Sequence, residues 1–312
     1  MNYVGIDIGG TNVKIAVVNA RGEILKKNSI KTRGPRNVEE VVDNIAEAVK
    51  DLTKNYDYAS IGVGCPGAID SKEGVVEYSP NLYWKNVPLA KMLSERTGKE
   101  VKISNDANVA ALGEHKFGAG KDYTDTALIT LGTGVGGGFV VDGKLFEGFK
   151  SKGTEIGHTV IRENGFQCTC GRKGCFETYA SATALIRETR YAMGKDIDKN
   201  SLMWDLCEHD LTKVDGKTAF TAFKKGDVLA RAVVEKYVKS LSEGILNVVN
   251  LFRSQAVILG GGVCGAGDIL TEPIQRRVDK YRYGGEESLR TMILIAQLGN
   301  DAGVIGAASL VM

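Results

Sequence analysis

The sequence predicts an α/β protein built from two related halves, and three observations support this fold class. Tyr3 to Val18 and Leu128 to Val141 share one design: a β-rich run, a glycine-rich turn and a second β-rich run. Elsewhere, stretches with apolar residues every three or four positions alternate with short apolar strands. The 312 residues suit two domains of ordinary size. We therefore expect two duplicated lobes that face one cleft.

The first half is expected to contain five strands with helices between and after them. Val38 to Leu52 carries apolar residues at helical spacing. Ser60 to Gly64 has the composition of a buried strand, and "NDANVAALGEHKFGAG" begins a helix at the end of the strand Val101 to Ser104. The other strands are expected over residues 3–7, 13–18 and 23–30.

The second half begins with its own hairpin at Thr126. A long buried helix is expected over residues 228–252, and strands over 256–259 and 292–296. The small residues of a last helix over 302–310 indicate that it packs back on the body. We expect an N-terminal domain of residues 1–118, completed by the helix in 300–312, and a C-terminal domain of residues 119–299.

The glycine-rich turns could be mistaken for a dinucleotide site, because Gly132, Gly134 and Gly137 have G-x-G-x-x-G spacing. That motif needs a helix after the glycines, so that the pyrophosphate rests on the helix N-terminus. Here Phe139 to Val141 continue into a strand, followed by the tight-turn pair Asp142-Gly143. The pattern therefore excludes a dinucleotide fingerprint and predicts a hairpin.

Two such glycine turns can close on one polyphosphate. Glycine lets backbone N–H groups approach an anion closely and adopts the positive φ values that aim them at it. Two ordinary hairpins that need glycine only for their geometry remain the alternative. The candidate phosphate-binding residues are Gly9, Gly10, Thr11, Asn12, Gly132, Thr133, Gly134, Gly136, Gly137 and Gly138.

A cysteine-rich segment suggests a metal site. Cys168, Cys170 and Cys175 lie within eight residues, and His158 precedes them by ten. Three thiolates and one imidazole form a closed tetrahedral set for structural Zn²⁺. Free thiols in a loop, or a redox pair, remain alternatives from the spacing alone.

Composition indicates a soluble cytoplasmic protein. The formal net charge is +2 with 25% charged residues, which gives no electrostatic bias towards nucleic acid or membrane. No apolar run approaches the roughly 20 residues that span a bilayer, and nothing resembles a signal peptide. Six cysteines in a chain of this length fit a reducing compartment better than a disulfide framework.

Seven motifs in series resemble the ROK family, named for repressors, open reading frames and sugar kinases. In order along the chain they are "DIGGTN", "GCPG", "NDAN", "LGTGVGGG", "EIGH", "CTCGRKGCFE" and "LGGGV". The resemblance implies an actin-like, ribonuclease-H-like fold with two α/β domains around an ATP cleft. It also implies transfer of the ATP γ-phosphate to the 6-hydroxyl of a hexose, with glucose as the expected substrate, and a homodimer.

The resemblance leaves related functions open. N-acetylmannosamine, fructose or allose kinases share most of these motifs, and a sugar sensor without turnover is a further alternative. An actin-like assembly ATPase would not need the cysteine loop. The first strand begins at Tyr3, so we expect no DNA-reading helix-turn-helix ahead of it.

The resemblance also implies roles for single residues. Asp106 would be the general base for the sugar hydroxyl, although an aspartate before a helix is often only its N-cap. The sugar would be held by Asn105, Glu155, His158 and Glu177, with looser contacts from Gly67 and Asn81. Surface charge is the alternative for both glutamates, and Glu177 could simply begin a helix. Thr154 stands where the family usually has a small residue.

The nucleotide side would use Asp7, Lys14 and the glycines at the end of a later strand. Asp7 would hold Mg²⁺ through water, because Mg²⁺ takes few carboxylates and keeps its waters. Lys14 would reach the phosphates, or be an ordinary solvated lysine. Adenosine would lie against Gly260, Gly261 and Gly262, which could also be a plain helix-entry turn. His158, Cys168, Cys170 and Cys175 would hold the zinc of the family's loop.

Overall fold

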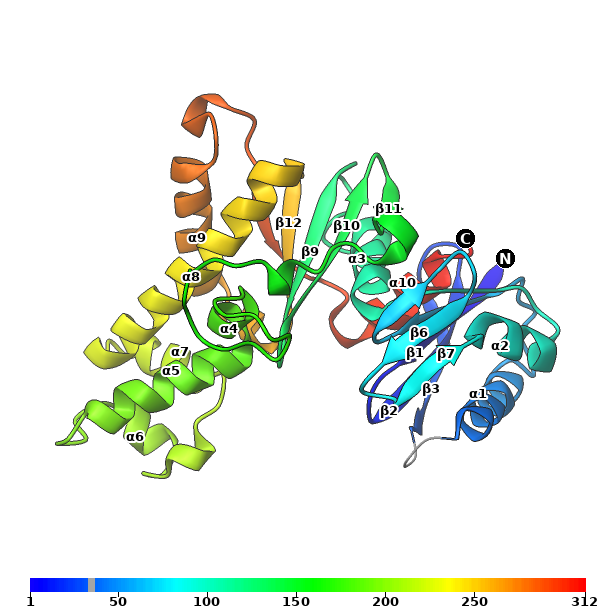
Figure 1. Ribbon diagram of the computed structural model, residues 1–312, viewed down its shortest axis with the longest axis horizontal. Coiled ribbons are helices and arrows are strands. Elements are labelled where there is room, and N and C mark those ends of the chain that lie inside the picture. The colour runs from blue at the N-terminus through cyan, green and yellow to red at the C-terminus, as the bar shows by residue number, and fades with distance from the viewer. Residues whose placement is uncertain (33–36) are drawn as a thin grey trace. The chain divides into compact units, whose positions relative to one another are not determined.

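The computed structural model describes residues 1–32 and 37–312 of the chain (Figure 1). These residues form two compact units. Unit 1 comprises residues 1–128, 137–154 and 296–312, and unit 2 comprises residues 129–136 and 155–295. The expected domain border after residue 118 stays a prediction. None of the described helices is long and apolar enough to cross a membrane.

Unit 1 is built on a five-stranded sheet in the order β3-β2-β1-β4-β8. The first three strands are antiparallel, and β4 and β8 run parallel to β1. The strands are β1 (Asn2–Ile8), β2 (Asn12–Asn19), β3 (Ile24–Lys31), β4 (Ile61–Cys65) and β8 (Val101–Asn105). All five predicted strands of the first half are confirmed.

Helices cover both faces of this sheet. They are α1 (Val38–Leu52), α2 (Leu89–Thr97), α3 (Asp106–Phe117) and α10 (Ala302–Ser309). Ile6 and Ile15 point to the face covered by α1 and α2, where they join its main core. Ala16 and Val18 point to the other face and pack against Val304 of α10. Alternation along each strand thus separates two apolar layers.

The terminal helix α10 lies directly on the backbone of its neighbours. A Cβ at Gly5 of β1 would lie 1.9 Å from a carbonyl oxygen of α10, and one at Gly62 of β4 would lie 1.7 Å from another. A Cβ at Gly306 of α10 would lie 1.6 Å from a carbonyl oxygen of α3. These three glycines are therefore required by close approach of backbones.

A buried carboxylate fixes the segment that leads into α10. Glu114 of α3 has no exposed surface. Its carboxylate oxygens accept hydrogen bonds from the backbone N–H groups of Ala119 at 3.0 Å, Gln297 at 3.0 Å and Leu298 at 2.7 Å. These bonds satisfy a charge that would otherwise be costly to bury, and they hold residues 297–298 against the end of α3.

A small antiparallel sheet of three strands was not predicted from the sequence. It consists of β5 (Ala68–Asp70), β6 (Val75–Ser79) and β7 (Trp84–Val87) in that order. Its strands are too short to give a clear alternation signal. Ile69, Val76 and Trp84 nevertheless bury their side chains in the main core of unit 1.

The second five-stranded sheet has the order β11-β10-β9-β12-β13. Its strands are β9 (Thr126–Leu131), β10 (Val135–Val141), β11 (Lys144–Phe146), β12 (Ala256–Gly260) and β13 (Met292–Ile295). The predicted hairpin after Gly132 is confirmed, because β10 follows the glycine turn without a helix. Asp142 and Gly143 both have positive φ, as a tight turn into β11 requires.

Six α-helices belong to unit 2. They are α4 (Glu177–Ala180), α5 (Ala182–Lys195), α6 (Met203–Leu206), α7 (Thr218–Lys224), α8 (Val228–Phe252) and α9 (Asp268–Tyr281). The long helix predicted over 228–252 is confirmed as α8. Short 3-10 turns occur at η1 (Phe149–Ser151), η2 (Ile156–His158), η3 (Leu211–Lys213), η4 (Gly262–Ala266), η5 (Gly285–Glu287) and η6 (Gly299–Asp301).

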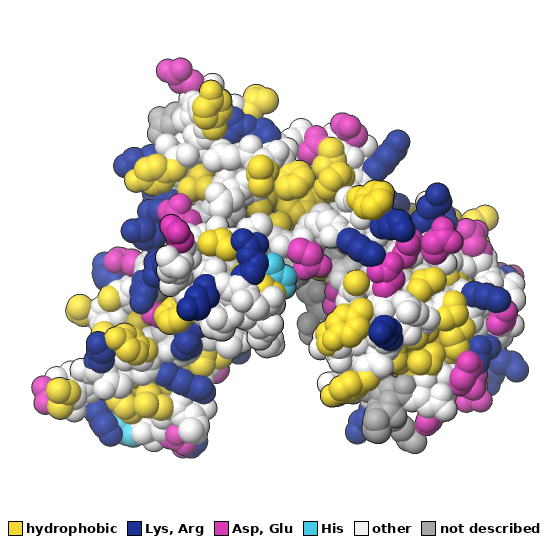
Figure 2. All heavy atoms as spheres, viewed as in Figure 1, with side chains coloured by type: hydrophobic (Ala, Val, Ile, Leu, Met, Phe, Trp, Pro, Cys, Tyr) yellow, Lys and Arg dark blue, Asp and Glu magenta, His cyan; other side chains and the backbone are white. Residues whose placement is uncertain are grey.

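Charged side chains of both signs are interspersed on the surface. On the face shown in Figure 2, lysine and arginine side chains alternate with aspartate and glutamate side chains. The chain has 40 basic and 38 acidic residues, so this mixture reflects its overall balance.

We predict that Gly306→Ala destabilises the protein by about 1–3 kcal/mol, the usual range for overpacking a tight contact. Gly194→Ala is the matched control, because Gly194 lies in α5 and has no atom within 4 Å of an added Cβ. There alanine should stabilise by about 0.5–1 kcal/mol through its higher helix propensity. Urea unfolding of both variants measures the two changes, and a Gly306→Ala protein as stable as wild type would contradict the packing of α10.

Candidate functional site

The end of β8 and the start of α3 present Asn105 and Asp106. The Asn105 side chain caps α3, since its Oδ1 accepts from the backbone N–H groups of Ala107 at 2.9 Å and Asn108 at 3.4 Å. Its Nδ2 donates to the carbonyl oxygen of Gly67 at 3.1 Å. Asp106 is the first residue of the helix and is exposed. Asn105 is therefore the N-cap residue of α3, and Asp106 Oδ1 also accepts from the Ala107 N–H at 2.9 Å.

Gly67 lies close to this helix start, and Asn81 belongs to the neighbouring small sheet. Gly67 has φ of +116°, and a Cβ there would lie 2.2 Å from the carbonyl oxygen of Tyr78. Asn81 is exposed in the turn between β6 and β7, just after Tyr78. The Asn105–Gly67 hydrogen bond thus links the small sheet to the start of α3. In unit 1 the structure brings together three predicted residues: Gly67, Asn105 and Asp106.

A partly buried hydrogen-bond network at this edge was not found from the sequence. Glu147 Oε1 accepts from the hydroxyl groups of Ser104 at 2.5 Å and Ser71 at 2.8 Å. Ser104 is buried and immediately precedes Asn105. The sequence does not predict the contact between these three residues, because they come from separate segments of unit 1.

The first glycine turn is closed by its own backbone and by a neighbouring strand. The Gly9 N–H donates to the Asn12 carbonyl oxygen at 2.9 Å. Thr32 binds the turn twice, through its N–H to the Thr11 carbonyl at 2.8 Å and its hydroxyl to the Gly9 carbonyl at 3.0 Å. Gly10 is exposed and would tolerate a Cβ. The carbonyl oxygens of Gly9 and Thr11 are thus already used within the protein.

Asp7 and Lys14 form a pair at the end of β1. Lys14 Nζ lies 3.6 Å from Asp7 Oδ2 and donates to the Asn300 carbonyl at 3.0 Å. A Cβ at Gly303 would lie 2.6 Å from the same carboxylate oxygen. Burial raises the pKa of Asp7, and the Lys14 ammonium opposes that rise. The ion pair argues against a purely solvated Lys14.

The second glycine turn is held by the start of α5. The carbonyl oxygens of Gly132 and Thr133 accept from the N–H of Ala182 and the hydroxyl of Thr183, each at 2.9 Å. The Gly132 N–H donates to the Gly134 carbonyl at 3.1 Å. Gly132 and Thr133 are exposed, as a phosphate contact would require.

The later glycines of this motif lie inside β10. Gly136 is partly buried, and its N–H donates to the Thr130 hydroxyl at 3.2 Å. Gly137 and Gly138 are buried. A Cβ at Gly138 would lie 2.8 Å from the carbonyl oxygen of Ala107 in α3. Gly138 therefore has a packing role in this structure.

Gly260, Gly261 and Gly262 connect β12 to η4, and Gly262 lines a cavity of unit 2. Gly260 ends β12 and Gly262 begins η4, and Gly261 has φ of +102° with a Cβ position 2.3 Å from the Leu131 carbonyl. The cavity has a volume of about 230 Å³ and runs between η4 and α7. The lining residues from α7, Phe220 and Thr221 among them, had no recognisable signal in the sequence.

The four predicted metal ligands converge. One ligand atom from each of His158, Cys168, Cys170 and Cys175 lies within 4.8 Å of all the others. Cys168 Sγ is 3.6 Å from His158 Nδ1, and Cys170 Sγ is 3.6 Å from Cys175 Sγ. Tetrahedral zinc with bonds of about 2.0–2.3 Å separates its ligands by about 3.3–3.8 Å. The donor set therefore fits one zinc ion.

The loop around these ligands is shaped by glycine. Gly171 and Gly174 have φ of +91° and +82°, and a Cβ at Gly174 would lie 1.8 Å from the carbonyl of Arg162. The N–H of Cys168 donates to the Arg172 carbonyl at 2.8 Å, which closes the loop. The cluster is thus preformed by the backbone.

Glu177 lies between the cysteine cluster and the second glycine turn. Its Oε1 accepts from Cys168 Sγ at 3.0 Å and lies 3.7 Å from His158 Nδ1. Its Oε2 would be 2.6 Å from a Cβ at Gly134. Its side chain is only 16% exposed, so Glu177 is not an ordinary surface charge. Glu177 is also the first residue of α4. Burial and this carboxylate raise the pKa of Cys168 to about 12, so a cation is needed to favour its thiolate.

Glu155 and Thr154 precede η2. Glu155 is exposed and lies at the N-terminal end of this turn. Thr154 has φ of +68°, a strained value for a β-branched residue. Its hydroxyl donates to Asn108 Oδ1 at 3.3 Å, which ties this strained position to α3. The departure at Thr154 therefore coincides with a backbone conformation that favours a smaller residue.

Known proteins are similar to this chain over nearly its whole length. The model of the ROK family matches residues 3–312. A glucokinase from Thermotoga maritima is 38% identical over 100% of this chain and 97% of its own length. A glucokinase from Streptomyces coelicolor is 34% identical over 98% of this chain and 96% of its own length.

A solved structure shows the same architecture. The crystal structure of a ROK family glucokinase from Streptomyces griseus in complex with glucose and AMPPNP has a TM-score of 0.83 and 35% identity. The match covers 99% of each chain. The predicted actin-like α/β fold with two domains is confirmed by this likeness. With the family model matched from Tyr3 to the last residue, the chain belongs to the ROK family.

Proposed function

We propose that this protein is an ATP-dependent hexose kinase that converts glucose to glucose 6-phosphate. The observation that carries the proposal is the full-length likeness to a glucokinase whose structure contains glucose and AMPPNP. The exposed Asp106 at the start of α3 supplies the group that such a reaction needs. Phosphoryl transfer depends on positioning and charge stabilisation more than on covalent chemistry by the protein.

Asp106 is proposed as the general base. The 6-hydroxyl of the sugar loses its proton to the Asp106 carboxylate as its oxygen attacks the γ-phosphorus of ATP, and ADP leaves. The role is supported by Asn105, because the Asn105 cap fixes the first turn of α3, whose first residue is the exposed Asp106.

Sugar binding is assigned to Gly67, Asn81 and Asn105 of unit 1 and to Glu155, His158 and Glu177 of unit 2. Carboxylates and an imidazole suit the dense hydroxyl donors of a hexose. His158 Nδ1 faces Cys168, so its Nε2 is the nitrogen assigned to a sugar hydroxyl. N-acetylmannosamine, fructose and allose remain the alternative substrates.

Nucleotide binding is assigned to the two glycine turns, Lys14 and Gly260 to Gly262. The exposed turn residues Gly10, Gly132 and Thr133 are assigned to the phosphates, and the cavity beside Gly262 to the adenosine. Asp7 is assigned to Mg²⁺ through water, an ion that would neutralise phosphate charge.

The cluster of His158, Cys168, Cys170 and Cys175 is proposed as a structural zinc site. Bound zinc would compensate the thiolates and fix the orientation of the His158 ring. We further propose a cytoplasmic homodimer, and domains of residues 1–118 with 300–312 and of residues 119–299.

We predict that the purified protein releases ADP from ATP and Mg²⁺ when glucose is present. The measurement is a coupled assay over a panel of glucose, N-acetylmannosamine, fructose and allose, scored by kcat/KM. Glucose should give the highest value. A higher value for another sugar would identify an alternative substrate, and turnover with none of them would reject the kinase.

The Asp106→Asn variant is the catalytic control for this assay. It should lower kcat by at least about 100-fold, the lower end of the range for losing a general base. Glucose binding, measured by calorimetry, should change less than about threefold, because the amide keeps the shape of the side chain. Wild-type turnover in this variant would exclude Asp106 as the base.

Zinc removal should weaken sugar binding. We predict about one zinc per chain by metal analysis, lost in Cys170→Ser, with glucose affinity about 10–100-fold weaker, the usual effect of disturbing the support of a binding group. Lys173→Ala is the matched control, since it alters an exposed residue of the same loop and no ligand. Metal-free wild-type protein with unchanged glucose affinity would reject the structural zinc.

The Asp7→Asn substitution should raise the stability of the protein and lower its activity. The folded pKa of Asp7 is raised by burial, so ionising this carboxylate costs stability as pH rises above its ordinary value of 3.8. Without nucleotide, the variant should have the higher melting temperature at pH 7, and the difference should vanish below about pH 4. Its kcat/KM should fall by about 100-fold.

Asp57→Asn is the control, because Asp57 is exposed. It should change neither quantity. A lower melting temperature at pH 7 for Asp7→Asn, or full activity of that variant, would contradict the assignment.

A further inference from the structure

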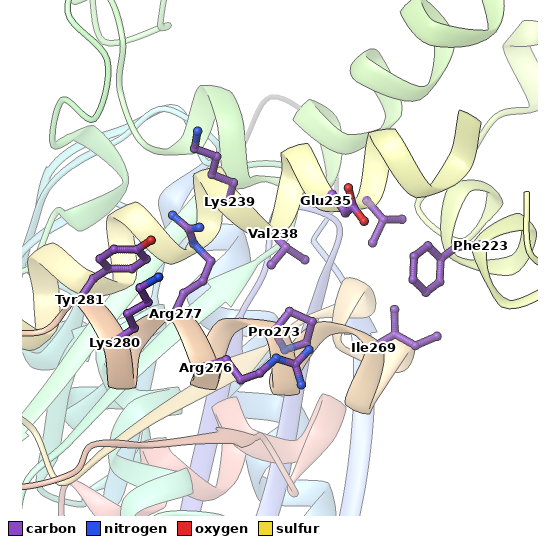
Figure 3. A pocket seen from close by; sticks show the side chains of 11 residues that line it. Phe223, Glu235, Val238, Lys239, Ile269, Pro273, Arg276, Arg277, Lys280 and Tyr281 are labelled. Atoms are coloured by element: carbon purple, nitrogen blue, oxygen red, sulfur yellow. The ribbon is translucent and has the colours of Figure 1, made fainter. Parts of the chain in front are cut away.

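A groove of about 600 Å³ lies between α8 and α9 of unit 2 and reaches Phe223 of α7 (Figure 3). Pockets for small ligands usually have about 300–1,000 Å³. None of the residues assigned above to sugar, nucleotide or metal lines this groove. It therefore offers a second concave surface that the proposed kinase reaction does not use.

The two ends of the groove differ in chemistry. Figure 3 shows Phe223 and Ile269 at one end, with Val238 and Pro273 along the middle. At the other end the figure shows the side chains of Lys239, Arg277, Lys280 and Tyr281. An apolar floor thus leads to a cationic end.

Two of the charged groups at the cationic end of the groove lack ion-pair partners in the described part of the chain. Arg277 Nη2 bonds to Glu243 at 2.7 Å, but its Nε is buried and has no hydrogen-bond partner among the described residues. In the described part of the chain, Lys239 and Lys280 make no ion pair. Glu235 is the one carboxylate in the described lining, and Figure 3 shows it towards the apolar end. A buried donor without a partner is costly, so an acceptor at this end would be stabilised.

An aromatic ring lies beside these cations. The Arg277 guanidinium lies 5.3 Å and the Lys280 ammonium 5.1 Å from the centre of the Tyr281 ring. The Tyr281 side chain is 51% exposed, which leaves surface for a planar group to stack on. The fourth cation, Arg276, is already paired with Glu272 at 3.3 Å.

We propose that this groove binds a phosphate monoester that carries an aromatic group. The phosphate would accept from Arg277 Nε and from the ammonium groups of Lys239 and Lys280, since charged donors form the stronger hydrogen bonds to phosphate. The aromatic group would lie over Val238 and Pro273. Inorganic phosphate has no aromatic group, so the apolar floor of the groove would stay exposed to water. A neutral aromatic compound would leave the Arg277 Nε donor without a partner. Phosphate alone and an aromatic group alone should therefore bind weakly.

An occupant of the groove would contact a helix that also borders the smaller cavity. Phe223 of α7 lines the groove, whereas Phe220 and Thr221 of the same helix line the cavity beside Gly262. The α9 residue Ile269 follows η4 in the chain and also lines the groove. The groove and the smaller cavity therefore share one helix, α7, and the chain runs from η4 of the cavity into α9 of the groove.

The test uses 1-naphthyl phosphate as the probe, with calorimetric titration of the full chain at fixed ionic strength. We expect saturable binding, at least tenfold weaker binding of inorganic phosphate and of 1-naphthol, and at least tenfold weaker binding of the probe by the double variant Lys239→Ala, Lys280→Ala. This variant should keep wild-type hexose kinase activity, because neither lysine belongs to the proposed kinase site.

The matched control is Lys26→Ala with Lys50→Ala, which removes the same charge from exposed positions of unit 1 and should bind the probe like wild type. Equal binding by the groove variant, or inorganic phosphate binding as tightly as the probe, would overturn the proposal. So would a change in the mass of the groove variant by analytical ultracentrifugation, since that would assign the groove to a second copy of the chain.

Discussion

The contact between α10 and the backbones of β1, β4 and α3 positions the polar groups of unit 1. Gly5 and Gly62 leave no side chain between the helix and the sheet, and Gly306 leaves none between α10 and α3. Asp7 ends in contact with Gly303 at the start of the same helix. One short helix therefore fixes both the strand that carries Asp7 and the helix that begins with Asp106. Small residues at these positions are required by distance and not by flexibility.

Unit 2 shows a different arrangement, in which one carboxylate connects two loops. Glu177 touches Cys168 of the cysteine loop and lies against Gly134 of the second glycine turn, while α5 holds the carbonyl groups of that turn. In both units some groups are unfavourable by themselves. In unit 1 Asp7 is a partly buried carboxylate and Thr154 has a positive φ, and in unit 2 the Cys168 thiol lies against a carboxylate. Such conflicts between local preference and structure are common where a protein holds ligands.

Long regular elements were predictable from the sequence, and short ones were not. The helix α8 follows from its 25-residue apolar stripe, and the two hairpins follow from glycine turns between β-rich runs. The sheet β5-β6-β7 was not predicted, because strands of three to five residues show too little alternation of apolar and polar residues. The convergence of the four metal ligands was predicted because they are close in sequence. The contacts of the partly buried Glu147 and the buried Glu114 were not predicted, since their partners are brought to them only by the fold.

The measurement that tests this account most directly is a crystal structure with glucose, AMPPNP and Mg²⁺ bound. We expect an Asp106 carboxylate oxygen about 2.6–3.2 Å from the 6-hydroxyl oxygen of glucose, within hydrogen-bond reach of the proton it removes. We also expect the Asn105 cap of α3 to be unchanged in the complex. A glucose 6-hydroxyl that is held by another carboxylate, with Asp106 pointing away from the sugar, would contradict it.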